Sequence, residues 1–202
     1  MNSDAAAVDL AAARHVEAVV IGASAGGFEA ILAVLKELPS TYPMPLVAVL
    51  HLPENHESKL PELFGYRLAL RVREARDKEP LEPGILYFAP SGYHLQVESD
   101  RSFSLSCEER VNYARPSIDV LFETASDAYG KTLAGILLTG ANYDGAAGLA
   151  GMKLAGALTI VQDPATAEVS TMPEAAIRRM APDLILPLAE IRSLLRRLGE
   201  NR

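Results

Sequence analysis

The chain has 202 residues, 49% of them hydrophobic, which is enough for one domain with a sizeable core or for two small ones. Its formal net charge of −7 argues against nucleic acid or an anionic membrane surface as a partner, because these bind clustered Lys and Arg. The single cysteine, Cys107, excludes an internal disulfide and fits a reducing compartment, so we expect a cytoplasmic protein. No apolar run reaches the roughly 20 residues that a membrane span needs, so we expect no membrane insertion.

Residues 1–15 are rich in alanine, but charged residues interrupt them before the apolar core of a secretory signal can form. We expect a flexible N-terminal tail or a weak helix here. No linker, repeat or low-complexity block divides the rest of the chain, which predicts a single domain over residues 16–202.

Beyond the tail, short apolar runs alternate with segments whose apolar residues recur at helical spacing. The runs predict buried strands and the intervening segments predict helices. The strands are expected at residues 17–23, 46–52, 71–75, 84–89, 132–139, 158–162 and 184–188. The helices are expected at residues 26–38, 58–66, 117–129, 144–154 and 173–180 and at the C-terminus.

One stretch departs from this alternation of strands and helices. Residues 94–98 and 102–108 alternate apolar and polar around a short polar turn, which predicts a β-hairpin with one face in water. The continuous apolar strands elsewhere are typical of a sheet that is buried on both faces. The predicted fold is therefore α/β: a doubly wound, mostly parallel sheet with helices on both faces and an antiparallel β-hairpin near residues 94–108.

Functional residues of such a sheet gather beyond the carboxyl ends of its strands. The first strand ends in the sequence Gly22-Ala23-Ser24-Ala25-Gly26-Gly27, which matches the G-x-S-x-G elbow that exposes a nucleophilic serine. A glycine-rich turn here also occurs in phosphate- and nucleotide-binding domains, and it can be purely structural. The motif by itself leaves these three interpretations open.

The second predicted strand ends at His51, and a later one leads to Asp144. A histidine in this place is either a catalytic base or a structural group bonded to the backbone. Asp144 stands where a helix begins, so it either caps that helix or accepts a hydrogen bond from the His51 ring. Ser24, His51 and Asp144 all fall at one edge of the predicted sheet, which favours a serine-hydrolase triad. No His, Cys, Asp and Glu cluster has metal-binding spacing, so we expect no metal.

Five ordered segments of the chain carry recognisable motifs. They are 19–27 (VVIGASAGG), 49–54 (VLHLPE), 115–121 (RPSIDVL), 136–149 (ILLTGANYDGAAGL) and 172–177 (MPEAAI). Together they resemble the catalytic domain of the bacterial chemotaxis protein-glutamate methylesterases. The resemblance spans about residues 16–195, nearly the whole chain.

The resemblance implies hydrolysis of glutamate γ-methyl esters on the cytoplasmic helices of methylated chemoreceptors, and deamidation of certain receptor glutamines. It implies that Ser24 is the nucleophile, His51 the general base and Asp144 the residue that orients the base. The backbone N–H groups of Ala25 and Ala141 are the implied oxyanion donors, and no cofactor is implied. Arg67, Arg71, Arg73 or Arg115 could contact acidic receptor segments, although Arg115 could instead be a buried partner of Asp119.

The chain departs from the family pattern in two ways. The family usually has a small, glycine-containing stretch before the aspartate, whereas this chain has Asn142-Tyr143. Residues 1–15 are also too short to form the receiver domain that commonly regulates these enzymes, so we expect that such a domain was removed from this sequence, that the enzyme is unregulated, or that a separate receiver protein controls it. Two alternatives remain open: a receptor-binding module of the same fold without catalysis, and a phosphate- or nucleotide-binding α/β domain.

Overall fold

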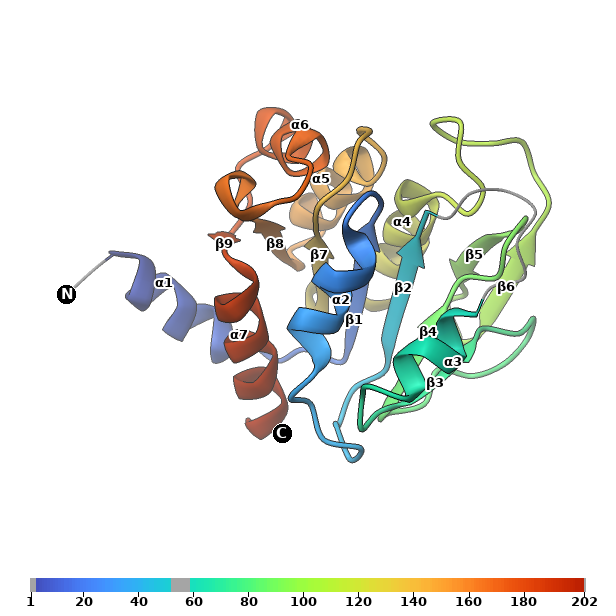
Figure 1. Ribbon diagram of the computed structural model, residues 1–202, viewed down its shortest axis with the longest axis horizontal. Helices are drawn as coiled ribbons and strands as arrows, with labels where there is room; N and C mark the ends of the chain where they lie inside the picture. The colour runs from blue at the N-terminus through green and yellow to red at the C-terminus, as the bar shows by residue number, and fades with distance from the viewer. Residues whose placement is uncertain (1–2, 52–58, 202) are drawn as a thin grey trace.

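The computed structural model describes residues 3–51 and 59–201, and seven strands of this part form one parallel sheet (Figure 1). Their order is β3-β4-β2-β1-β7-β8-β9, and every adjacent pair is parallel. The strands are β1 (Ala18–Ala23), β2 (Leu46–Leu50), β3 (Arg71–Glu74), β4 (Ile85–Phe88), β7 (Leu133–Leu137), β8 (Leu158–Gln162) and β9 (Leu184–Leu186). From β1 the chain builds the sheet outward first through β2 and later through β7, so strand order reverses between β1 and β7.

A separate two-stranded antiparallel sheet pairs β5 (His94–Val97) with β6 (Phe103–Ser106). The predicted hairpin and the doubly wound parallel sheet are both confirmed. The end of the second predicted strand and the start of the helix predicted at 58–66 lie outside the described residues.

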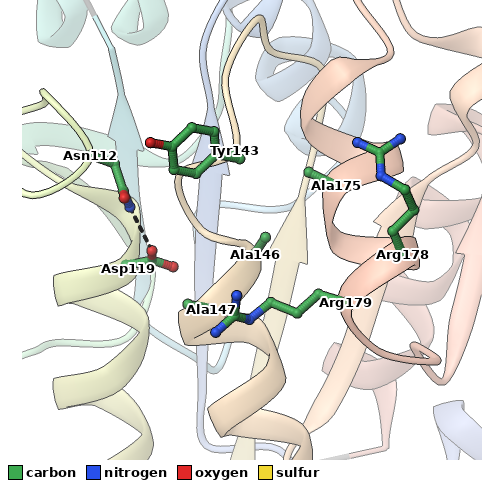
Figure 2. Close-up of a pocket in the computed structure, with 8 residues that line it drawn as sticks. All are labelled: Asn112, Asp119, Tyr143, Ala146, Ala147, Ala175, Arg178 and Arg179. Atoms are coloured by element: carbon green, nitrogen blue, oxygen red, sulfur yellow. Dashed lines mark hydrogen bonds between the residues drawn. The ribbon is translucent and has the colours of Figure 1, made fainter.

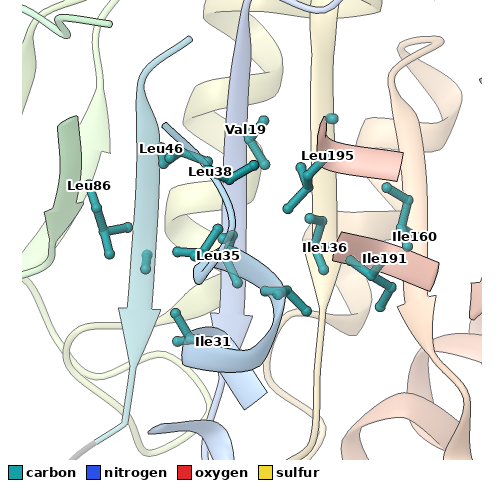
Figure 3. Packing of buried hydrophobic residues seen from close by; sticks show 14 of the residues in the cluster. Val19, Ile31, Leu35, Leu38, Leu46, Leu86, Ile136, Ile160, Ile191 and Leu195 are labelled. Carbon is teal, nitrogen blue, oxygen red and sulfur yellow. The ribbon is translucent and has the colours of Figure 1, made fainter. Parts of the chain in front are cut away.

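Helices cover both faces of the large sheet, and alternate strand residues point to opposite faces. The helices are α1 (Ser3–Ala12), α2 (Gly27–Leu35), α3 (Leu60–Gly65), α4 (Ile118–Tyr129), α5 (Ala146–Leu154), α6 (Thr171–Arg179) and α7 (Leu188–Glu200). On one face, Ile31 of α2 and Leu195 of α7 belong to one buried cluster that also contains Val19 and Ile136 of the sheet (Figure 3). On the other face, α4, α5, α6 and the hairpin cover the intervening strand residues, of which Val20 is one. The inner strands β1, β2, β4, β7 and β8 are therefore buried on both sides, as their continuous apolar sequences predict, whereas the edge strands β3 and β9 are partly exposed.

The N-terminal segment carries helix α1, which packs beside α7 near the C-terminus (Figure 1). Asp9 forms an ion pair with Arg197 at 2.9 Å, and the carbonyl of Ala12 accepts a hydrogen bond from the Asn201 side chain at 2.9 Å. Flexibility of residues 1–15 stays a prediction. No helix in the described part of the chain is both long and apolar enough to cross a membrane.

Candidate active site

Ser24 lies immediately after β1, in the turn that leads into α2. Its backbone N–H donates to the carbonyl of Thr139 at 3.0 Å, and its own carbonyl accepts from Gly27 at 2.8 Å. Gly26 adopts a left-handed φ of 74°, which a residue with a Cβ rarely adopts. A Cβ on Gly27 would lie 2.6 Å from a side-chain carbon of Leu50. The glycines of the predicted elbow thus permit a tight turn against the neighbouring strand.

His51 follows β2, the strand beside β1. Its backbone N–H donates to the carbonyl of Ala23 at 3.1 Å, which places it next to Ser24. The Nε2 atom of the imidazole lies 2.9 Å from Oδ2 of Asp144. The Nδ1 atom lies 3.3 Å from the side-chain nitrogen of Asn142.

Ser24 and His51 line one cavity of about 310 Å³ at the carboxyl edge of the sheet. Asn112, Tyr113 and Tyr143 are among its other lining residues. The Ser24 hydroxyl is not hydrogen-bonded to His51. Catalytic hydrogen bonds are often longer in a protein without substrate and tighten when substrate binds.

Asp144 is fully buried, and its carboxylate is surrounded by hydrogen-bond donors. Oδ1 accepts from the Ser117 hydroxyl at 2.8 Å, from the Asn112 side chain at 2.9 Å and from the Asp119 N–H at 3.2 Å. Oδ2 accepts from the Ile118 N–H at 2.6 Å in addition to its contact with His51. Burial by itself would raise the pKa of Asp144, but the hydrogen bonds, foremost that of His51, outweigh it and leave the pKa below its ordinary value.

The two helices at the site exchange their N-terminal caps. Asp144 lies just before α5 but caps α4, through the backbone N–H groups of Ile118 and Asp119. Asp119 lies in the first turn of α4 but accepts from the Gly148 N–H of α5 at 2.7 Å. Of the two interpretations of Asp144, a cap of the helix that follows it is therefore wrong, because its carboxylate turns toward the neighbouring helix.

Asn112 joins the two carboxylates of this exchange. Its side-chain nitrogen donates to Asp119 at 2.7 Å and to Asp144 at 2.9 Å, and its backbone adopts a left-handed φ of 52°. Burial raises the pKa of Asp119, the Gly148 N–H opposes this, and the negative charge of Asp144 raises it further. The amide therefore separates two acids that would otherwise repel each other.

Sequence reasoning did not assign Asn112, Ser117 or Asp119 to the site. The segment 115–121 carries part of the family resemblance, and it supplies both the Ser117 hydroxyl and the N-terminus of α4. Arg115 does not pair with Asp119, contrary to one of our alternatives. It donates instead to the carbonyls of Cys107 and Glu108, at 2.8 and 2.9 Å.

The arginines expected near a receptor differ in their placement. Arg115 lines the cavity that holds Ser24. Arg67, Arg71 and Arg73 lie on the α3 and β3 side of the molecule, where they form ion pairs with glutamates, and they do not line that cavity.

The two predicted oxyanion donors lie on the two loops beside Ser24. Ala25 and Ala141 are exposed, and in the described part of the chain neither backbone N–H donates a hydrogen bond within the protein. The loops are close together, since a Cβ on Gly140 would lie 3.0 Å from Cβ of Ser24. Both N–H groups are therefore available to a ligand oxygen.

A second cavity, of about 530 Å³, adjoins the first and shares Asn112 and Tyr143 with it (Figure 2). Arg179 extends from α6 toward Ala147 at the start of α5, and Arg178 points away from it. Among the described residues, no group of three or more His, Cys, Asp and Glu side chains could hold a metal ion.

A doubly wound α/β domain with Ser24, His51 and a buried Asp144 at its switch point has the arrangement of a serine hydrolase. More narrowly, the chain belongs to the CheB methylesterase family, whose sequence profile matches residues 19–195. This membership decides against the phosphate- or nucleotide-binding alternative.

Named relatives agree with this family assignment. A Leptospira interrogans protein provisionally named protein-glutamate methylesterase/protein-glutamine glutaminase is 45% identical, over 92% of this chain and 96% of its own length. Proteins of the same name from Anaeromyxobacter dehalogenans and Bordetella parapertussis are 43% and 42% identical over 93% and 91% of this chain. The match covers only 55% and 53% of those two longer proteins.

The fold also matches a solved structure. The crystal structure of the Thermotoga maritima CheB methylesterase catalytic domain superposes with a TM-score of 0.84 at 31% identity. The superposition covers 90% of this chain and 98% of that one.

Proposed function

We propose that this chain is a cytoplasmic serine esterase that hydrolyses glutamate γ-methyl esters on the helices of methylated chemoreceptors. The hydrogen bond between His51 Nε2 and Asp144 Oδ2, at the cavity that Ser24 lines, is the observation that carries the proposal. The relatives named protein-glutamate methylesterase/protein-glutamine glutaminase support the class of substrate. Control by a separate receiver protein stays a prediction.

In the first step, Oγ of Ser24 attacks the ester carbonyl carbon and its proton passes to Nδ1 of His51. Nδ1 is the ring nitrogen left for this step, because Nε2 is committed to Asp144, and the Asn142 amide must give way at Nδ1 as the proton arrives. When the C–O bond to the methoxy group breaks, the protonated Nδ1 returns the proton and methanol leaves. The product of this step is an ester between the receptor glutamyl group and Ser24.

In the second step, a water molecule attacks the acyl-enzyme and gives a proton to Nδ1. The bond to Oγ then breaks, Oγ recovers the proton, and the receptor side chain leaves as glutamate. Deamidation of glutamine follows the same path with ammonia as the first leaving group. In both steps the negative charge on Asp144 stabilises the imidazolium that forms.

The negative charge that develops on the carbonyl oxygen needs donors near Ser24. The N–H groups of Ala25 and Ala141 fit this role because both are free and exposed beside the serine. In related hydrolases the loss of one such donor lowers kcat about 10²–10³-fold.

The surface around the cavity suits a protein substrate that carries acidic groups. Tyr113 and Tyr143 are 87% and 55% exposed and line the cavity that holds Ser24. Arg178 and Arg179 line the adjoining cavity. Tyrosine and arginine are the residues that contribute most often to protein interfaces.

The proposal is tested with Ser24→Ala, using methanol release from methylated receptor as the assay. The variant should fold normally and lose turnover by several orders of magnitude, because no other hydroxyl replaces the nucleophile. Ser193→Ala is the matched control, since Ser193 lies exposed on α7, and it should keep full activity. Turnover by Ser24→Ala at the control's rate would exclude Ser24 as the nucleophile.

A receptor-binding module without turnover is the second candidate. It is favoured by the Asn142 amide at Nδ1 of His51, where the Ser24 hydroxyl would have to bind. A serine-directed organophosphate separates the two candidates. Labelling at Ser24 supports the enzyme, and a chain that binds receptor but takes up no label supports the module.

A further inference from the structure

We propose that Asn142 is a positioning residue that keeps the proton of neutral His51 on Nε2 and holds Nδ1 as the free base. The side-chain nitrogen of Asn142 lies 3.3 Å from Nδ1, and the side-chain oxygen accepts from the Asp144 N–H at 3.1 Å. The proposal deepens the proposed function, because it rests on His51 as the general base.

The orientation of the Asn142 amide follows from its second contact. A backbone N–H can only donate, so the amide atom that faces the Asp144 N–H is the oxygen. The NH₂ group must then face His51. A donor at this place requires a lone pair on Nδ1, which means that Nδ1 carries no proton.

The state of Asp144 agrees with the same tautomer. Hydrogen bonds lower the pKa of Asp144 against the effect of burial, so the group is a carboxylate and can only accept. Nε2 must therefore donate to it, across 2.9 Å. An acceptor on one side of the ring and a donor on the other leave a single arrangement of the imidazole proton.

Asn142 stabilises the neutral ring of His51 but destabilises the protonated ring. Once Nδ1 takes the Ser24 proton, two donors face each other, and the Asn142 contact is lost. The amide thus favours neutral imidazole, ready to accept a proton, and disfavours imidazolium. Asp144 does the reverse, so His51 is held between a group that stabilises its charge and a group that opposes it.

The other charged and titratable groups around the cavity do not supply this contact. Tyr113, Tyr143 and Arg115 line the cavity, and Asp119 lies behind Asp144, bridged to it by Asn112. A glycine, which the family pattern favours in this stretch, has no amide side chain. The contact therefore belongs to the Asn142 that this chain has before its aspartate.

A purely structural role for Asn142 makes a different prediction. Its oxygen forms a local turn with the Asp144 N–H, and a serine in its place can form the same kind of turn. Asn142→Ser keeps that acceptor but loses the donor to Nδ1. Asn142→Gly loses both, and Asn142→Asp replaces the donor with a charged acceptor that favours a proton on Nδ1.

The first test is the pH dependence of kcat/KM for methanol release. Loss of one hydrogen bond to neutral His51 should move the acid limb of Asn142→Ser and Asn142→Gly to higher pH, by about half to one pH unit. Asn142→Asp should move it further in the same direction. Profiles of the serine and aspartate variants that coincide with the wild type would overturn the proposal.

The second test is nitrogen-15 NMR of the histidine rings in the full chain, with His51 assigned through a His51→Gln variant. The wild type should show the proton on Nε2 and a bare Nδ1, and Asn142→Asp should show a protonated Nδ1 at neutral pH. A proton on Nδ1 in the wild type refutes the role of Asn142 whatever the activity. The expected tautomer in a chain without esterase activity would sink the proposed function and leave this inference standing.

Discussion

The Asp144→Asn substitution tests whether the site requires a charged acceptor at this position. Asparagine has nearly the same shape, but one of its two terminal atoms is an NH₂ group. Every atom that now faces the carboxylate donates a hydrogen bond to it. The substitution therefore replaces an acceptor with a donor wherever the NH₂ group is placed.

The cost follows from the two possible placements of the NH₂ group. In the place of Oδ2 it faces the Ile118 N–H and the ring of His51, and in the place of Oδ1 it faces the Asp119 N–H. Either way, a buried backbone N–H of α4 loses its acceptor, which costs about 1–3 kcal/mol. Loss of the negative charge at the N-terminus of α4 adds about 0.3–1 kcal/mol. We expect Asp144→Asn to lower the free energy of unfolding by about 1–4 kcal/mol.

Urea unfolding measures this change in stability, by linear extrapolation of the free energy of unfolding. Asp127→Asn is the matched control, because Asp127 is exposed on the same helix α4 and should change stability by less than about 0.5 kcal/mol. The activity of the Asp144 variant should fall about 10⁴-fold in kcat, as it does for the corresponding aspartate of a serine protease. An Asp144→Asn protein as stable as the Asp127 control would refute the reasoning about the surrounding donors.

Two further substitutions test the left-handed backbone at Gly145 and the charge of Asp183. Gly145→Ala should lower the free energy of unfolding, measured in urea, by about 1–3 kcal/mol. Gly145 has a φ of 90°, and a Cβ there would lie 2.6 Å from a side-chain carbon of Ile118, the first residue of α4. Gly151→Ala, mid-helix with open space around it, is the control and should stabilise by about 0.5–1 kcal/mol. Burial tends to raise the pKa of Asp183, but hydrogen bonds from Lys153 and Thr159 leave it below the ordinary value of 3.8. The stability that Asp183 contributes is thus complete above about pH 4 and is lost as the pH falls through the lowered pKa. Unfolding curves from pH 7 to pH 2.5 should show the deficit of Asp183→Asn shrinking with acid, and a constant deficit would contradict this.

Much of the fold could be predicted because local patterns determine it. Runs such as 132–139 are almost entirely apolar, a pattern that is typical of strands buried on both faces. The rule that functional groups gather at the carboxyl ends of parallel strands then selected Ser24, His51 and Asp144. The structure places the first two at one cavity and bonds His51 to Asp144, while their catalytic roles stay a proposal.

The partners of Asp144 could not be predicted in the same way. Asn112 reaches the carboxylate from a left-handed backbone position, and no local pattern announces that the loop turns back toward α5. The exchange of caps between α4 and α5 depends on how two helices pack, which is set by the tertiary structure. The sequence marks Asn142 only as part of a departure from the family pattern, and its contact with His51 appears only when the two loops come together.

The sequence left two interpretations of Asp144, a helix cap or the acid of a triad, and the structure shows why they are not alternatives. An acid that supports an imidazolium must stay ionised although it is buried, and burial alone favours its neutral form. The backbone N–H groups at the start of α4 supply fixed donors that offset this cost. The capping contacts keep the carboxylate charged, and that charge allows Asp144 to accept from His51. A residue that only capped α4 would not need the contact with the His51 ring. An acid that supports a catalytic histidine at this place does need the N–H groups of α4, because they keep it ionised.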